Sequence, residues 1–411
     1  MKKERPVHVK MDQFPVEDDC LLIGGTKLTR LAERIGKTPF YAYDRQFLTR
    51  RMAYLRANLP KAIRIHYAMK ANPMPAVVQH MSGLADGMDV ASASEMKVAL
   101  DTPMPAEKIS MAGPGKRPEE LRQAIAAGIT IHIESETELD RIEDQAKRLD
   151  LQPRVAIRIN PAFELKASGM KMGGGAKPFG IDEEYLPQIL NRIGNLDFEF
   201  IGFHIFSGSQ NLNADSIIQA QKESIALAIR LAEFCPAPIR KLNIGGGLGI
   251  PYFPGEKHLD LPRIGEALGE RMVELERSLP ETSLILELGR YLVGEAGIYV
   301  CRIIDRKISR GEVFLVTDGG LHHHLAASGN FGQVIRKNYP VVIGNRVLGG
   351  PREIANVVGP LCTPLDLLAV QMEMSKARIG DFVVVFQSGA YGRSASPQDF
   401  LSQPRAEEIL V

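Results

Sequence analysis

The chain has 411 residues, enough for two or three domains, and its 50 lysines and arginines nearly balance 49 aspartates and glutamates. This balance excludes a bulk electrostatic attraction to nucleic acid or to an anionic membrane, so small molecules or other proteins are the expected partners. Four scattered cysteines predict neither a disulfide framework nor a zinc site, and no apolar run is long enough to span a bilayer. We therefore expect a cytoplasmic protein.

Two short β-like segments, VHVK and CLLIGG, open the chain, and eight β-rich runs follow them. In order they are RIHYAMK, GMDVAS, KISMAG, ITIHIES, RVAIRIN, FIGFHIFSG, KLNIGGG and SLILELG. Between several of these runs apolar residues recur at helical spacing, and Ser135 followed by Glu138 is typical of a capping box. Strands that alternate with helices in this way predict an α/β fold, a parallel (β/α)8 TIM barrel over residues 39–285.

The pattern changes after the barrel. Over residues 286–411 the runs GIYVCRIIDRKI, EVFLVTDGG, YPVVIGNRVL and DFVVVF are β-like, with turns between them and little helical pattern. We expect a separate β-sandwich or β-barrel domain here. Residues 1–38 are expected to join it, because a barrel does not need their strands.

Catalytic groups of such barrels lie at the carboxyl ends of the strands, so the residues at those ends are the first candidates. In strand order they are Lys70, Asp89, His204 with Ser207, Gly245 with Gly246 and Gly247, and finally Glu287 with Arg290. Each alone has an ordinary explanation, such as a solvated lysine, a structural histidine, a tight turn or an ion pair. Their joint placement at one mouth predicts a single site.

This set of side chains suits pyridoxal 5'-phosphate. Lys70 can form a Schiff base with the cofactor, and a glycine run supplies backbone N–H donors to its phosphate. Ser207 and Arg290 add a hydroxyl and a guanidinium to the phosphate contacts. His204 can stack on the pyridine ring, and Glu287 can keep the pyridine nitrogen protonated. The ring then accepts the electrons left when a bond to the substrate's α-carbon breaks.

Six motifs, YAMKANP, FHIFSGSQ, NIGGGLG, ELGRYLV, GPLCTPLD and SGAYG, occur in this order. With them the chain resembles the fold type III pyridoxal phosphate decarboxylases, such as diaminopimelate and ornithine decarboxylases, over nearly its whole length. The resemblance implies an alanine racemase-like fold, an amino acid carboxy-lyase and a homodimer with shared active sites. It implies that Tyr391 contacts the phosphate end, and Asp89 and Gly289 are further cofactor-binding candidates. It also implies that Cys362 enters the neighbouring subunit's pocket and returns a proton to the α-carbon.

The residue after this cysteine departs from the family pattern. In diaminopimelate and ornithine decarboxylases it is acidic and binds the substrate's distal ammonium, whereas here it is Thr363, followed by Pro364, with Asp366 at its usual offset. The predicted substrate therefore has a distal end that is not an ammonium. GGGLGIPYF and DGGLHHHLAAS are similar to a subgroup with the L-glutamyl-[acyl-carrier protein] decarboxylase and the exosortase A-associated decarboxylases. That resemblance implies an aminoacyl thioester on an acyl-carrier protein.

Six residues of the chain are candidates for contact with the substrate. The candidate substrate-binding residues are Arg290, Arg336, Tyr339, Thr363, Asp366 and Tyr391. Residues 166–180 are interpreted as a loop over the active site, and Lys166, Lys171 and Lys177 in it could dock a carrier protein. His322, His323 and His324 are assigned to the pocket wall or to structure rather than to a metal, because neighbours on a strand point to opposite faces.

Three alternatives stay open. The first is a diaminopimelate, ornithine or lysine decarboxylase that acts on a free amino acid. The second is an alanine racemase-like enzyme, although those enzymes place an arginine rather than an acid such as Glu287 at the pyridine nitrogen. The third is a non-catalytic relative that keeps the fold as a binding protein, although such relatives tend to lose the lysine, the glycines or the cysteine.

Overall fold

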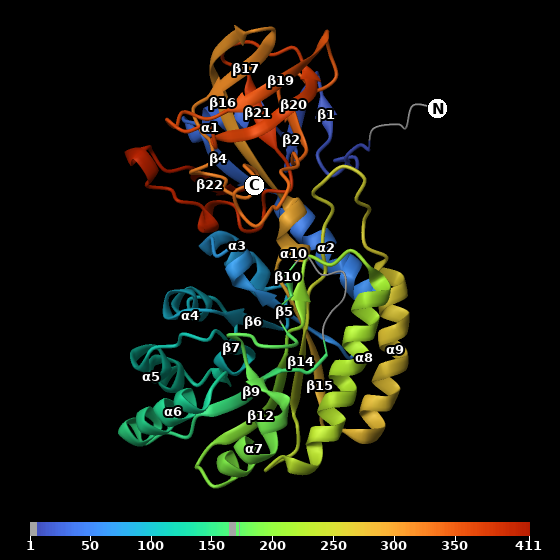
Figure 1. The fold of residues 1–411 in the computed structure, drawn as a ribbon, viewed down its shortest axis with the longest axis vertical. Coiled ribbons are helices and arrows are strands. Elements are labelled where there is room, and N and C mark those ends of the chain that lie inside the picture. Colours follow the sequence, from blue (N-terminus) through green and yellow to red (C-terminus); the bar gives the residue numbers. More distant parts are fainter. Residues whose placement is uncertain (1–5, 164–169, 172) are drawn as a thin grey trace. The chain divides into compact units, whose positions relative to one another are not determined.

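The computed structural model describes residues 6–163, 170–171 and 173–411. The chain forms two compact units (Figure 1). One, the β domain, comprises Met1–Arg50, Pro251–Lys257 and Leu292–Val411, and the other, the barrel, comprises Arg51–Ile250 and His258–Tyr291. The helix α2 (Arg45–Asn58) begins in the first unit and ends in the second.

The barrel is a closed ring of eight parallel strands within the described residues, and each strand falls on one of the predicted runs. They are β5 (Arg64–Ala68), β6 (Gly87–Val90), β7 (Ile109–Met111), β8 (Thr130–Ile133), β9 (Arg154–Asn160), β12 (Glu199–Ile205), β14 (Lys241–Gly246) and β15 (Ser283–Leu288). Pairing of β15 with β5 and of β8 with β9 closes the ring. The predicted (β/α)8 barrel is confirmed.

Helices follow the strands on the outside of the barrel (Figure 1). They are α3 (Pro75–Ser82), α4 (Ala93–Leu100), α5 (Pro118–Ala127), α6 (Glu136–Leu149), α7 (Leu186–Gly194), α8 (Ala214–Leu231) and α9 (Leu261–Ser278). One of the two hydrogen bonds of the predicted capping box of α6 is present: the Ser135 hydroxyl accepts the Glu138 N–H. The Glu138 carboxylate accepts the N–H of Glu134 instead of that of Ser135. This small difference ties the helix to the end of β8.

The β domain is built on a mixed sheet with the strand order β18-β21-β16-β17-β19-β20. These strands are β16 (Gly297–Ser309), β17 (Glu312–Thr317), β18 (Val341–Ile343), β19 (Arg352–Val358), β20 (Leu367–Ser375) and β21 (Phe382–Val385). A small antiparallel sheet of β1 (Val16–Glu17), β2 (Cys20–Ile23) and β3 (Thr26–Lys27) precedes helix α1 (Leu28–Ile35). Leu21 and Leu28 share a buried apolar core with Val300 and Val384, so the strand on the CLLIGG run belongs to this domain, whereas the expected VHVK run forms no strand.

The strand β4 (Phe40–Tyr43) also lies in the β domain, although the expected barrel began at residue 39. It pairs with β16 on one side and with β22 (Glu407–Leu410) on the other. The run FYAY stands directly before a helix, and the sequence alone does not distinguish this pattern from a barrel strand. At the other end, the compact barrel unit extends to Tyr291 rather than to residue 285.

The four cysteines of the chain are all described and all free thiols. Across the ranges that the structure covers, no helix combines the length and the apolar character needed to cross a membrane.

Candidate active site

Lys70 lies just past the end of β5, in the short 3-10 helix η1 (Met69–Ala71). Its neighbours Met69 and Ala71 are buried, whereas the Lys70 side chain is 44% exposed. The backbone is thus anchored on both sides of an accessible amine. The Lys70 Nζ donates a hydrogen bond to Oε1 of Glu287, 3.1 Å away, across the ladder between β5 and β15.

Glu287 is the central carboxylate of the site and is buried. Its Oε2 lies 3.1 Å from Nε2 of His204 and accepts a 3.5 Å hydrogen bond from the Asn243 amide. Burial raises the pKa of Glu287, but the charge of Lys70 and the contact with His204 outweigh burial and hold that pKa well below its usual range. Glu287 is therefore an anion at neutral pH.

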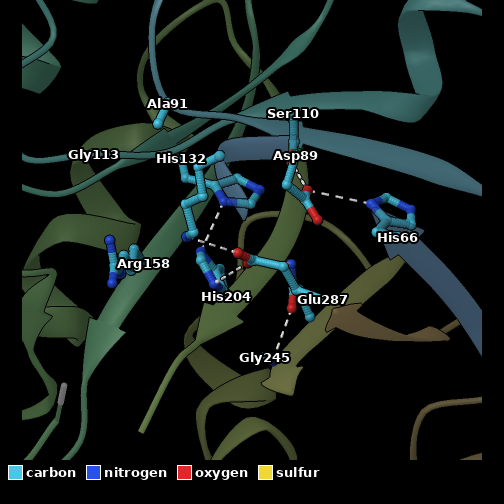
Figure 2. A network of polar contacts seen from close by, with 12 residues as sticks. His66, Asp89, Ala91, Ser110, Gly113, His132, Arg158, His204, Gly245 and Glu287 are labelled. Atoms are coloured by element: carbon cyan, nitrogen blue, oxygen red, sulfur yellow. Dashed lines mark hydrogen bonds and ion pairs between the residues drawn. The ribbon is translucent and has the colours of Figure 1, made fainter. Parts of the chain in front are cut away.

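His204 lies on β12 with its ring in the barrel interior, and a second imidazole, that of His132 on β8, lies beside it (Figure 2). The two Nδ1 atoms are 2.9 Å apart. Figure 2 shows a continuous row of polar contacts from Glu287 through His204 to His132. Glu287 thus contacts both Lys70 and His204, two of the strand-end residues that the sequence predicts at the same mouth.

Asp89 is the last residue but one of β6 and is buried beside the same interior (Figure 2). Its Oδ1 accepts a hydrogen bond from the Ser110 hydroxyl and lies 3.3 Å from Nδ1 of His66. Its Oδ2 is buried and has no hydrogen-bond partner among the described residues. A buried carboxylate oxygen without a partner is costly, which suits a position that a ligand group completes.

The turn after β14 requires glycine at each of its three positions. Gly245 and Gly247 have φ of +66° and +70°, and a Cβ on Gly245 would lie 2.6 Å from the ring of Phe206. A Cβ on Gly246 would collide with the main-chain oxygen of Glu287. The Gly245 N–H donates to the Asn243 side chain, 2.8 Å away, which holds this turn against the end of β14.

Gly289 and Arg290 follow β15 directly, and Arg290 begins the one-turn helix α10 (Arg290–Val293). A Cβ on Gly289 would lie 2.8 Å from the Ala71 side chain and 3.1 Å from the oxygen of Ala68. The absence of a side chain at Gly289 therefore lets the end of β15 approach the segment that carries Lys70. Arg290 is half-buried at this junction.

Ser207 is buried in the turn between β12 and the two-residue strand β13 (Gly208–Ser209). β13 pairs with β10 (Met170–Lys171), which belongs to the expected active-site loop. The loop and the Ser207 turn are thus joined by main-chain pairing. Lys166 lies outside the described residues, and Lys177 is half-buried in the turn before β11 (Ile181–Asp182).

These residues fit pyridoxal phosphate. They combine an accessible amine on Lys70, a buried anion on Glu287, an unpartnered oxygen on Asp89 and a glycine turn that a Cβ would fill. Such a donor set matches the aldehyde, the ring nitrogen and the phosphate of this cofactor.

A buried ion network that the sequence analysis did not single out lies at the ends of β7, β8 and β9. The Glu134 carboxylate accepts hydrogen bonds from Nη1 of Arg158 at 3.0 and 3.1 Å and from the N–H groups of Gly113 and Gly180. Lys116 lies 3.0 Å from the Glu138 carboxylate and 4.0 Å from that of Glu134. These contacts fix three strand ends and the segment before β11 to one another.

The turn between β19 and β20 carries Cys362, Thr363 and Asp366. Cys362 is exposed, but Asp366 is buried, and its Oδ1 and Oδ2 accept the N–H groups of Leu321 and Leu361 at 2.6 and 2.8 Å. Burial raises the pKa of Asp366, and these two N–H groups oppose that rise. Both oxygens thus bind main chain, which disagrees with the expected substrate contact and instead makes Asp366 a support of the Cys362 turn.

Arg336 and Tyr339 also have protein partners in the β domain. The Arg336 guanidinium donates to the oxygens of Ser328 and Leu367, both at 3.1 Å, and to the Asn338 side chain at 2.7 Å. The Tyr339 ring is buried against Tyr252, with ring centres 4.8 Å apart. Arg336 therefore holds its own loop rather than presenting an open fork to a substrate carboxylate.

Tyr391 lies in the turn after β21 and has φ of +53°, a left-handed conformation that is uncommon for a tyrosine. Strain of this kind is frequent at functional sites and is consistent with the expected ligand contact. The Thr363 hydroxyl accepts the Leu365 N–H at 3.3 Å and is half-buried in its turn.

The three successive histidines are buried in the β domain. Burial lowers the pKa of His322 and His323 to about 4 and that of His324 to about 3, so all three are neutral at pH 7. Nε2 of His323 lies 2.8 Å from the oxygen of Pro404, and Nε2 of His324 lies 2.9 Å from the Ser388 hydroxyl. Among the residues with described positions, no cluster of three or more His, Cys, Asp or Glu could hold a metal ion.

Sequence reasoning missed His66, Ser110, His132, Glu134 and Arg158. A signal was present, since His132 and Arg158 interrupt otherwise apolar strands, ITIHI and RVAIRI. A polar residue inside such a strand must find a partner in the barrel, which is a reason to include it among site candidates.

Comparisons with known proteins agree with this site. Residues 45–294 match the family described as "Pyridoxal-dependent decarboxylase, pyridoxal binding domain". The L-glutamyl-[BtrI acyl-carrier protein] decarboxylase of Niallia circulans is 40% identical over 390 residues, 93% of this chain and 91% of that protein. The diaminopimelate decarboxylase of Aquifex aeolicus is 32% identical over 96% of this chain and 91% of its own. The crystal structure of diaminopimelate decarboxylase from M. jannaschii with L-lysine superposes with a TM-score of 0.88 at 25% identity, covering 97% and 92% of the two chains.

Proposed function

The chain belongs to the pyridoxal-dependent decarboxylases, and on that basis we propose that it removes the α-carboxylate of a glutamyl group carried as a thioester on an acyl-carrier protein. The enzyme is a pyridoxal phosphate-dependent carboxy-lyase. When bound, the cofactor supplies an aldehyde that condenses with amines and a ring that accepts electrons from the substrate's α-carbon.

One observation supports the choice of substrate. In the turn 359–366 the side chains beside Cys362 are Thr363 and Pro364, and the one acid of the turn, Asp366, has both oxygens bonded to main-chain N–H groups. A substrate with a distal ammonium would need a carboxylate that this turn does not offer. A side-chain carboxyl held as a thioester is neutral and needs none. The relative with 40% identity is named for such a carrier-bound substrate.

In this proposal each barrel residue of the site contacts a different part of the cofactor. Lys70 attaches the cofactor, Glu287 holds the proton on the ring nitrogen, and His204 covers the ring face. The phosphate is bound by Gly246 and Gly247 through main-chain N–H groups. Ser207, Arg290 and Tyr391 complete the phosphate contacts, and Gly245, Gly289 and Asp89 complete the remaining cofactor contacts.

We also propose a homodimer in which Cys362 of one subunit serves the pocket of the other. The exposed thiol and the anchoring of its turn through Asp366 support this role. A thiol close to a cationic site can donate a proton to the α-carbon after carbon dioxide leaves. Thr363 would then lie next to the neutral distal end of the substrate.

A substrate panel tests this function. The holoenzyme is given γ-L-glutamyl pantetheine thioester, a glutamyl-loaded carrier protein, free L-glutamate, diaminopimelate, L-ornithine and L-lysine, and loss of carbon dioxide is followed by mass spectrometry. We expect turnover of the thioesters and little turnover of the free amino acids. Ordinary turnover of free diaminopimelate, ornithine or lysine with inert thioesters would contradict the proposal.

The Thr363→Asp variant sharpens the same experiment. It restores an acid after Cys362, so we expect lower kcat/KM for the thioester and higher kcat/KM for ornithine or lysine, because a buried ammonium then gains a partner. Thr363→Val is the matched control, since it keeps the side-chain shape and adds no charge. Equal changes in both variants would show that charge at this position does not select the substrate.

A further inference from the structure

His132 has no role in the site described so far, yet it is buried in direct contact with His204. It lies on β8, and β9 separates that strand from β12, which carries His204. The β9 residue opposite His132 is Ala156. Its small side chain leaves room for the two imidazoles to meet inside the barrel, with Nδ1 atoms 2.9 Å apart and ring centres 4.6 Å apart (Figure 2).

The contact between two Nδ1 atoms restricts where the protons are. A hydrogen bond at this distance needs a proton on one Nδ1 and a lone pair on the other. If His132 donates, a neutral His204 carries its own proton on Nε2. If His204 donates while its Nε2 is bare, the partial negative charge of that nitrogen lies 3.1 Å from the Glu287 anion, which is repulsive. The favourable arrangements all place a proton on Nε2 of His204.

Electrostatics around His132 support the same arrangement. Burial and the neighbouring His204 hold the pKa of His132 well below its usual range, so its ring is neutral. The charged groups that act on it are Glu287, Lys116 and Arg158. A neutral His132 that donates to His204 places the one proton of a neutral His204 on Nε2, whereas a His132 that accepts from His204 is compatible with a proton on Nε2 only when His204 is doubly protonated.

We propose that His132 is a positioning residue that fixes the ring orientation and the tautomer of His204, so that the His204 proton is on Nε2, the nitrogen that lies 3.1 Å from Oε2 of Glu287. Through its contact with Nδ1, His132 holds the His204 imidazole beside the Glu287 carboxylate. The role is comparable to that of the outer partners of metal-bound histidines, which set the tautomer from the far side of the ring. The inference rests on the proposed function only for its activity measurement.

Two substitutions separate this role from simple packing. Asparagine carries its amide nitrogen on Cγ, as histidine carries Nδ1, so His132→Asn can still donate to Nδ1 of His204. His132→Leu introduces an apolar side chain of similar size and removes the hydrogen-bond donor. The holoenzymes are compared by nitrogen-15 NMR of their labelled histidines, by the pH dependence of the cofactor's visible absorbance, and by kcat and KM on the panel substrate. His204→Asn identifies the His204 signals.

We expect the wild type and His132→Asn to carry the His204 proton on Nε2 and to share one absorbance profile with pH. His132→Leu should lose that tautomer preference and lose about tenfold or more in kcat, with KM changed less than about threefold. A bare Nε2 in the wild type would overturn the proposal, and so would a folded His132→Leu with wild-type tautomer, absorbance and kcat.

Two further outcomes are equally decisive. Equal loss of kcat in both variants with an unchanged His204 tautomer would show that His132 acts by packing alone. If His132→Leu does not fold, a His132→Asn enzyme that loses the Nε2 proton overturns the proposal, and one that retains it supports the donor role. The NMR and absorbance measurements need no substrate, so they remain valid even if the thioester is not turned over.

Discussion

Glu134 offers the clearest test of how the barrel holds its strand ends together. In Glu134→Gln the shape of the side chain is kept, but Arg158, whose side chain is 8% exposed, loses its charged partner, and Lys116, 2% exposed, keeps Glu138. Breaking one partner of a buried ionic network costs about 3–5 kcal/mol. For a domain of this size, about 2–4 °C per kcal/mol predicts a melting transition roughly 6–20 °C lower.

Differential scanning calorimetry is the appropriate assay, because the chain has no tryptophan to report unfolding by fluorescence. The control is Asp215→Asn, which removes one partner of the pair with Arg263, whose side chains are 68% and 54% exposed. An exposed pair contributes about 0–1 kcal/mol, so this variant should melt within about 4 °C of the wild type. If Glu134→Gln melts no lower than Asp215→Asn, the network does not stabilise the barrel.

The same variant has a defined pH dependence. Burial raises the pKa of Glu134, but Arg158, Lys116 and the Gly113 N–H outweigh burial and hold that pKa below its usual value. A lowered carboxyl pKa stabilises the fold above the unfolded value of about 4.3, and this stabilisation is lost as pH falls through the folded value. The difference between wild type and Glu134→Gln should therefore be full at pH 7 and shrink below about pH 4.

Three further predictions concern the site. Lys70→Ala should lose the visible absorbance of covalently attached cofactor, and a variant that retained it would refute the assignment of Lys70. Asp366→Ala should lower the melting temperature and kcat but leave that absorbance, since two N–H groups, of Leu321 and Leu361, lose acceptors at about 1–3 kcal/mol each; wild-type kcat would argue against a role in positioning the turn. Cys362→Ser should lower kcat by about 10²–10⁴ with cofactor binding unchanged, as expected for loss of a general acid, and full activity would exclude that role.

Much of the barrel site was predictable because the topology of a parallel barrel places every strand end at one mouth. Lys70, His204 and Glu287 stand far apart in sequence, yet each ends a recognisable β run, and the structure brings them within 3.1 Å contacts. The glycine turn was equally visible in the sequence, because positive φ of the kind found at Gly245 and Gly247 strongly favours glycine.

The remaining features depend on side-chain direction, which strand patterns do not give. Asp366 keeps the expected offset from Cys362, but its carboxylate turns inward to two main-chain N–H groups. The contact between His132 and His204 needs the register of β8 and β12 on β9, together with a small residue at Ala156. No periodicity in the chain encodes that register, so the contact emerges only in three dimensions.

The central claim is that the α-carboxylate of a carrier-bound glutamyl group is removed, and a labelled substrate tests it directly. The holoenzyme is incubated in deuterated water with γ-L-glutamyl pantetheine thioester that carries carbon-13 in its α-carboxyl. The account predicts labelled carbon dioxide and a product with one deuterium on the former α-carbon. Retention of the label with exchange or inversion at the α-carbon would indicate a racemase-like reaction, and an unchanged thioester beside decarboxylated free diamino acid would contradict the proposed substrate.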